Sequence, residues 1–100
     1  MTDRPLVFED FADKVGDAFA VSEEGAAAIA LTLKEAKLLN PEWGLKGVRP
    51  PFSLSFLAAD PRVLPQRLYR LNHQRLGAVT IFLVPSGKNA EGVSYHATFN

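Results

Sequence analysis

Phe52-Ser53-Leu54-Ser55-Phe56 is the stretch that decides the fold, because its apolar and small polar residues alternate without a break. A period of two places successive side chains on opposite faces of a β-strand. We therefore expect the two phenylalanines and the leucine to face a core, and the two serines to face solvent. A strand with one apolar and one polar face is typical of an antiparallel sheet.

The sequence at the N-terminal end predicts one short helix. Phe8, Phe11 and Val15 fall on one face of a helix, and acidic residues lie between them. Gly16 follows at once and is suited to the left-handed conformation that ends a helix.

The period then changes from 3.6 to 2, which predicts a hairpin. Residues 18–22 and 28–33 alternate, and a turn with a glycine is expected at 23–25. Residues 34–40 contain good helix formers but continue the second strand, and we expect extended structure there. Residues 40–51 hold three prolines and two glycines, which predicts a loop.

The sequence after residue 56 predicts three further strands in a meander. Residues 67–73 alternate, and the expected inward set is Tyr69, Leu71 and His73. Residues 79–84 are apolar on both faces, so their outer face needs a cover, for which the N-terminal helix is the simplest candidate. Residues 86–92 read as a polar loop, and residues 93–99 form the last strand.

These elements predict a mainly β fold for the whole chain, residues 1–100, as a single domain. About six short strands and one short N-terminal helix are expected to form a small antiparallel barrel or sandwich. Alternation alone does not choose between the barrel and the sandwich.

Composition excludes several classes of protein. Hydrophobic residues make up 47% of the chain and charged residues 22%, as in a globular domain. The chain has no cysteine, which excludes disulfides, thiolate nucleophiles and zinc–thiolate sites. A formal net charge of zero gives no general attraction to nucleic acid or to an anionic membrane. With no signal segment and no apolar run of about 20 residues, we expect a cytosolic protein that does not enter a membrane.

Residues with catalytic chemistry show no productive spacing. Ser53 and Ser55 lie on a strand and not in a nucleophile turn, and no phosphate-binding loop is present. His73 and His96 fall on different strands, with no carboxylate at ligand spacing. We therefore expect no enzyme activity, no cofactor and no metal.

Charge distribution along the chain is the feature that stands out. Residues 1–24 hold seven acidic side chains against two basic ones, whereas residues 61–90 hold no acid and five bases, Arg62, Arg67, Arg70, Arg75 and Lys88. These two regions either complement each other within one molecule, or join copies head to tail, or bind an anionic partner. Single-stranded nucleic acid is the least favoured of these partners. Trp43 lies in the Pro/Gly-rich loop and is either a lid on the core or an interface residue.

A second hypothesis is a barrel that holds an apolar ligand, with Tyr69, His73 and Tyr95 at its mouth. His73 in particular has two interpretations. Either it is a strand-end histidine bonded to backbone or to a tyrosine hydroxyl, or it is a proton carrier shared with Tyr95.

Several strand and turn segments together resemble a family of small bacterial proteins known only as a domain of unknown function. They are Phe8-Glu9-Asp10-Phe11, residues 52–56, Leu64-Pro65-Gln66 leading to Tyr69, Leu76-Gly77 leading to Phe82-Leu83-Val84-Pro85, and Tyr95 to Asn100. The resemblance implies a neighbourhood of phage-tail-like genes and an assembly role, and it supplies no catalytic residue. The leading hypothesis is a non-enzymatic domain that works by protein–protein contact or self-association.

Overall fold

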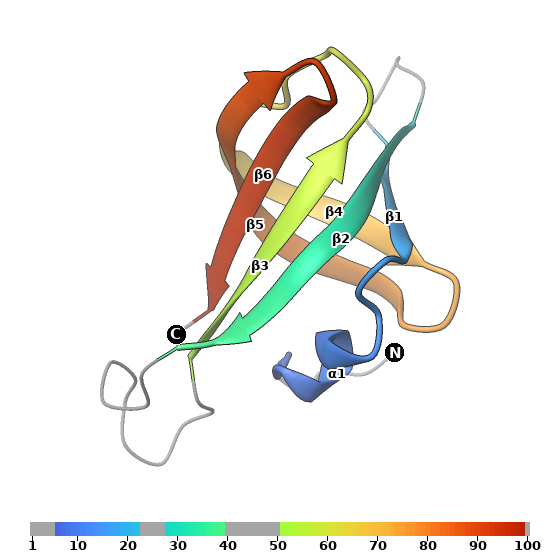
Figure 1. Ribbon diagram of the computed structural model, residues 1–100. Coiled ribbons are helices and arrows are strands. Elements are labelled where there is room, and N and C mark those ends of the chain that lie inside the picture. The colour runs from blue at the N-terminus through green and yellow to red at the C-terminus, as the bar shows by residue number, and fades with distance from the viewer. Residues whose placement is uncertain (1–5, 23–27, 40–50, 100) are drawn as a thin grey trace.

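The computed structural model describes residues 6–22, 28–39 and 51–99 and shows a mainly β fold (Figure 1). Its elements are α1 (Glu9–Ala12), β1 (Ala18–Val21), β2 (Ile29–Leu38), β3 (Phe52–Ala58), β4 (Arg67–His73), β5 (Gly77–Asn89) and β6 (Gly92–Phe99). All strand pairs are antiparallel, which confirms the predicted fold class. In the described ranges no helix has the length and apolar character needed to cross a bilayer.

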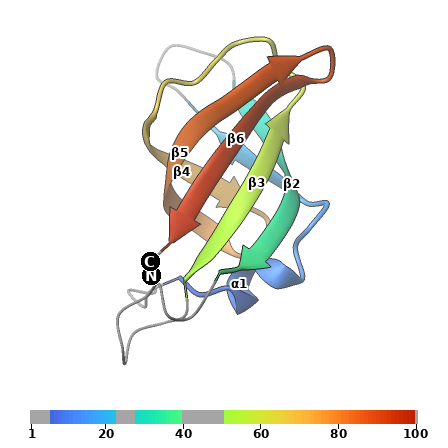
Figure 2. The ribbon, with the colours of Figure 1, turned by 60° about the vertical axis from the view of Figure 1, so that its left-hand side comes forward.

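The six strands close into a barrel in the order β1-β2-β3-β6-β5-β4 (Figure 2). The last three strands form the predicted meander, and β3 pairs with β6 along seven positions. The ring is closed by β1 and β4, which pair at only two positions, Ala20 with Asn72 and Val21 with Leu71. The structure thus answers the question that alternation left open, in favour of the barrel.

Side-chain alternation fills the barrel interior as predicted. Phe52, Leu54 and Phe56 are buried, and so are the inward residues of β4. Ser53 was expected in solvent but is only 8% exposed, because it lies between Lys37 of β2 and Thr98 of β6 in the paired strands. The predicted extended structure of residues 34–40 is confirmed as far as Leu38.

The N-terminal helix is shorter than predicted and covers one end of the barrel (Figures 1 and 2). Phe11 on α1 is fully buried, and its ring lies 6.0–6.1 Å from the rings of Phe19, Phe52 and Phe99. The prediction that Val15 shares this buried face is wrong. The chain leaves the helix at Asp13 and turns, which leaves Val15 48% exposed.

Two tyrosines hold the segment between β3 and β4, residues 59–66, against the other end of the barrel. The backbone N–H of Leu64 donates to the Tyr95 hydroxyl over 2.9 Å, and that hydroxyl lies 3.4 Å from the Arg62 carbonyl. The Tyr69 hydroxyl donates to the Pro65 carbonyl over 2.5 Å. Leu64 is buried as a result and completes the core at this end.

The predicted loop at residues 86–92 is wrong over most of its length, because β5 continues to Asn89. The ladder with β6 shifts register between Pro85 and Gly87 and then resumes. Gly92 follows the turn with a φ of +134°, and a Cβ atom there would lie 1.9 Å from the carbonyl oxygen of Ala58. The predictions for residues 23–25, for the loop up to residue 50 and for Trp43 lie outside the described residues.

Candidate functional site

The surface of β4 and β5 that points away from the core is the best candidate for a functional site. We call it the outer β4–β5 face and define it by six residues that are all exposed, Leu68, Arg70, Asn72, Ala78, Thr80 and Phe82. They form three directly paired positions across the two strands, and Leu68 lies opposite Phe82.

The register of the hairpin explains why two large apolar side chains reach solvent. Tyr69 and Leu71 on β4 and Ile81 and Leu83 on β5 point into the core, so the residues that alternate with them, Leu68 and Phe82 among them, must point outward. Leu68 is 64% exposed and Phe82 is 45% exposed. The expectation that the N-terminal helix covers this face is wrong, because Phe11 of α1 is used at the end of the barrel.

The outer β4–β5 face is basic at its centre and carries no acid. Arg70 is exposed between Leu68 and Asn72, and no carboxylate in the described ranges forms an ion pair with it. The Arg67 guanidinium lies close by on the same strand, 5.2 Å from the centroid of the Tyr69 ring. This distance is typical of a cation–π contact.

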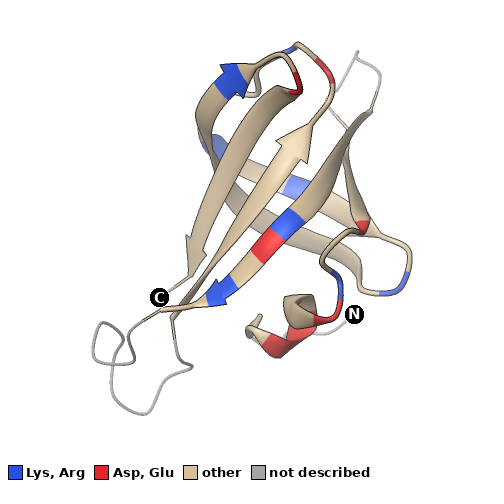
Figure 3. Ribbon diagram, in the orientation of Figure 1, with Lys and Arg blue, Asp and Glu red and all other residues tan. Residues whose placement is uncertain are grey.

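The remaining arginines of the predicted basic surface are paired with acids. Arg62 binds Asp60 through two guanidinium nitrogens at 2.6 and 3.0 Å. These side-chain hydrogen bonds lower the pKa of Asp60 to about 2 and raise the pKa of Arg62. Arg75 lies 3.3 Å from Asp17. Of the predicted basic residues, Arg70 therefore lies on the outer β4–β5 face, Arg67 alternates with it and contacts the Tyr69 ring, and Arg62 and Arg75 are paired with acids. Figure 3 shows how basic and acidic residues are distributed over the ribbon.

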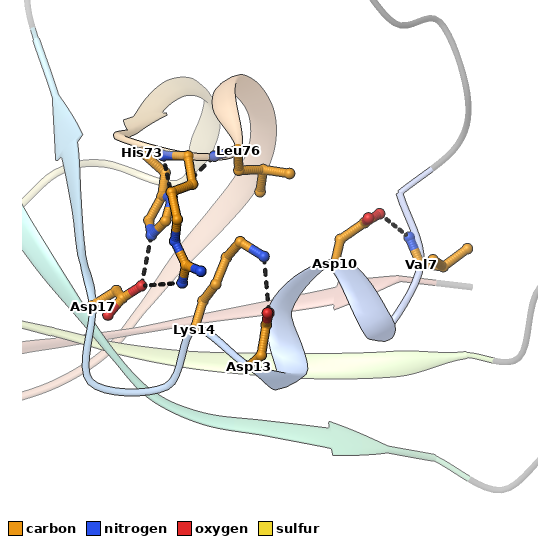
Figure 4. Close-up of polar contacts among 8 residues, drawn as sticks. Val7, Asp10, Asp13, Lys14, Asp17, His73 and Leu76 are labelled. Atoms are coloured by element: carbon orange, nitrogen blue, oxygen red, sulfur yellow. Dashed lines mark hydrogen bonds and ion pairs between the residues drawn. The ribbon is translucent and has the colours of Figure 1, made fainter.

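His73 is held by contacts on both ring nitrogens (Figure 4). Its Nε2 atom lies 2.8 Å from an Asp17 carboxylate oxygen, and its Nδ1 atom accepts the backbone N–H groups of Arg75 and Leu76, each at 3.1 Å. Because Nδ1 is an acceptor, Nε2 carries the proton and donates it to Asp17. The hydrogen bond from His73 lowers the pKa of Asp17, and the Arg75 guanidinium adds to this effect.

This arrangement matches the structural interpretation of His73 and adds a partner that sequence reasoning missed. Asp17 lies 56 residues away along the chain, and only the β1–β4 junction of the closed barrel brings it near. Neither ring nitrogen has a lone pair left to take up a proton from a substrate. His96 lies apart from this cluster, exposed on β6.

The three residues predicted for a ligand mouth do not converge. The hydroxyls of Tyr69 and Tyr95 both contact residues 62–65, whereas His73 contacts Asp17. His73 is four residues from Tyr69 on β4, about 13 Å along an extended strand. A depression of about 180 Å³ lies at Asp17, Ala18, His73 and Gln74, smaller than the roughly 300 Å³ at which small-molecule pockets begin. Residues 6–22, 28–39 and 51–99 contain no cluster of three or more metal-ligating side chains.

Comparison with known proteins places the chain in a family without assigning an activity. No curated protein and no solved structure matches it. One family model matches residues 6–99, which is nearly the whole chain and includes every element of the barrel. The chain belongs to the family described as Domain of unknown function (DUF6916).

Proposed function

We propose that this domain is a non-enzymatic protein–protein interaction module that binds a protein partner through the outer β4–β5 face. The observation that carries the proposal is the paired exposure of Leu68 and Phe82 beside Arg70 on one surface. Adjacent large apolar residues on an exposed sheet mark interaction sites more often than isolated ones do.

The chemistry of this face suits a protein better than a small molecule. A small ligand needs a concave pocket, and the outer surface of a barrel is convex. Aromatic residues and arginine are enriched at the centres of protein interfaces. Burying a fully exposed side chain of this size contributes about 1.5–3 kcal/mol, and Leu68 and Phe82, which are already partly covered, would each contribute roughly half of that against a partner.

The contacts of His73 support the non-enzymatic part of the proposal. General base catalysis requires a free lone pair within reach of a substrate proton, and both nitrogens of His73 are already engaged. An assembly related to phage tails is the setting that we propose for the module, and this point is supported by the sequence resemblance alone.

Photo-crosslinking tests the proposal in cells of the source organism. A photoreactive phenylalanine analogue at position 82 should give a covalent adduct with a partner protein. The same analogue at Lys37, exposed on β2, is the matched control and should give none. Adding Leu68→Glu should abolish the adduct from position 82. The absence of any adduct from position 82 would contradict the proposed function.

A further inference from the structure

We propose that the outer β4–β5 face is occupied by a second copy of this chain, which docks the segment around α1 in a head-to-tail arrangement. This inference rests on the proposed function and names its partner. The docking segment comprises residues 9–15, and we call it the acidic segment after Glu9, Asp10 and Asp13.

The acidic segment complements the outer β4–β5 face in charge and in apolar character. Glu9 is exposed, and no lysine or arginine in the described ranges forms an ion pair with it. Asp10 is half-buried and accepts the backbone N–H of Val7, and Asp13 is paired with Lys14, so the charge that this segment offers to a partner is mainly that of Glu9. Val15 adds an apolar side chain that is 48% exposed. The partner face offers the opposite charge and a larger apolar surface.

Other acidic side chains in the described ranges fit this face less well. Asp60 is neutralised by Arg62, and Asp17 by its contacts in the His73 cluster. Glu35 lies on β2 in a stretch that also carries Lys34 and Lys37. Glu91 is exposed in the tight turn between β5 and β6, three residues after Lys88 and with no exposed large apolar residue beside it in the turn. Residues 9–15 therefore offer an exposed acid, Glu9, that no lysine or arginine of the described ranges pairs with, and an exposed apolar residue, Val15, in one segment.

The arrangement of elements allows each copy to use both surfaces at once. α1 covers one end of the barrel, whereas β4 and β5 form part of its wall (Figures 1 and 3). The contact is thus heterologous, and its repetition generates a ring or an open chain. A two-fold contact between two outer faces would instead bring two basic surfaces together, which charge repulsion disfavours.

Charge exchange tests the inference on the full chain. Sedimentation velocity at several protein concentrations should show reversible association of the wild type, weakened by high salt. Glu9→Arg and Arg70→Glu should each weaken association at least tenfold. An equimolar mixture of the two variants should restore association, because the segment of each variant then meets a face of opposite charge on the other variant. The double variant should associate as well, because its segment and its face again carry opposite charges. Glu35→Arg is the matched control on β2 and should leave association unchanged.

The outcomes separate this inference from the proposed function. A wild type that stays monomeric at all concentrations and salts overturns the inference, while an adduct between position 82 and a different protein would leave the proposed function standing. Association that neither variant weakens, or that the mixture does not restore, overturns the head-to-tail contact. Thermal unfolding of each variant verifies that it folds, and Glu9→Gln provides a milder change with the same expected direction.

Discussion

At the scale of single residues, His73 shows how a buried polar side chain becomes part of the framework. Its side chain is only 1% exposed, yet both nitrogens have hydrogen-bond partners, and its ring lies 4.7 Å from that of Phe19. Burying a polar group without a partner is costly, so these contacts are what permits a histidine in the wall of this barrel. The alternation in β4 predicted its inward direction, and only the fold could reveal Asp17.

The first prediction concerns the tautomer of His73. Because Nδ1 accepts two backbone N–H groups, the neutral ring should carry its proton on Nε2. Nitrogen-15 chemical shifts of the imidazole at neutral pH would measure this directly. A proton on Nδ1 would contradict the arrangement, and His96, which is exposed, serves as the internal reference.

The second prediction concerns acid stability. The pKa of Asp60 is lowered to about 2 and that of Asp17 is lowered as well, so the folded protein binds their protons at lower pH than the unfolded chain does. Their contribution to stability is full above the ordinary value of 3.8 and disappears as pH falls through the folded pKa. Asp60→Asn should therefore lower the free energy of unfolding most above pH 4. Near pH 2 the variant and the wild type should have similar free energies of unfolding.

Urea unfolding at a series of pH values tests this second prediction. Asp13→Asn offers a comparison at an exposed carboxylate whose pKa is lowered by Lys14. The free energies of unfolding of the wild type and Asp60→Asn should differ less at pH 2 than at pH 7. The same difference at both pH values would contradict the proposed contribution of the Arg62 contact.

At the scale of elements, the segment 59–66 depends on the tyrosines of β4 and β6. Tyr95→Phe removes the acceptor of the Leu64 N–H, which is buried, and an unsatisfied buried donor costs about 1–3 kcal/mol. Tyr69→Phe removes the hydroxyl that donates to the Pro65 carbonyl, and because Pro65 is exposed, water can replace that donor and the loss of stability should be smaller. Chemical denaturation of both variants measures the two losses. Equal losses of stability in the two variants would contradict the prediction that the buried Leu64 N–H depends on the Tyr95 hydroxyl.

The turn between β5 and β6 gives a prediction with a close control. Gly92→Ala forces a side chain into a positive φ and against the Ala58 carbonyl, so we expect a loss of several kcal/mol or failure to fold. Gly87→Ala meets no atom within 4 Å and has an ordinary φ, so its effect should be small. Thermal unfolding measures both variants, and a Gly92→Ala protein as stable as the wild type would contradict the structure at this turn.

The elements also show where prediction from sequence succeeds and fails. Strict alternation in residues 52–56 and 67–73 identified the side chains that face the core, because a period of two places alternate residues on the same face of a strand. It did not predict the burial of Ser53 on the other face. The prediction for Val15 failed because the helix ends after one turn, and periodicity over so few residues does not show where a helix stops. The prediction for residues 86–89 failed because the strand continues past a bulge, which interrupts the period of two. The exposure of Phe82 depended on where α1 packs, which is a tertiary property.

At the scale of the whole molecule, folding converts a strong charge asymmetry along the chain into a weaker one in space. Arg75 is matched by Asp17 from the other end of the chain, and Arg62 by its neighbour Asp60. Arg70 on β4 stays exposed beside two exposed apolar residues, whereas the exposed lysines of the described ranges lie on β2 and at the far end of β5. The proposed binding surface is defined by this combination and not by net charge.

The most direct test of this account is a concentration series of two-dimensional ¹H–¹⁵N NMR spectra of the isotope-labelled wild type at low salt. We predict concentration-dependent shifts at two separate surfaces, residues 68–70 and 80–82 on the outer β4–β5 face and residues 9–15 around α1. High salt should reduce both sets of shifts together. Spectra that do not change with concentration, or shifts confined to other surfaces such as β2, would contradict the account.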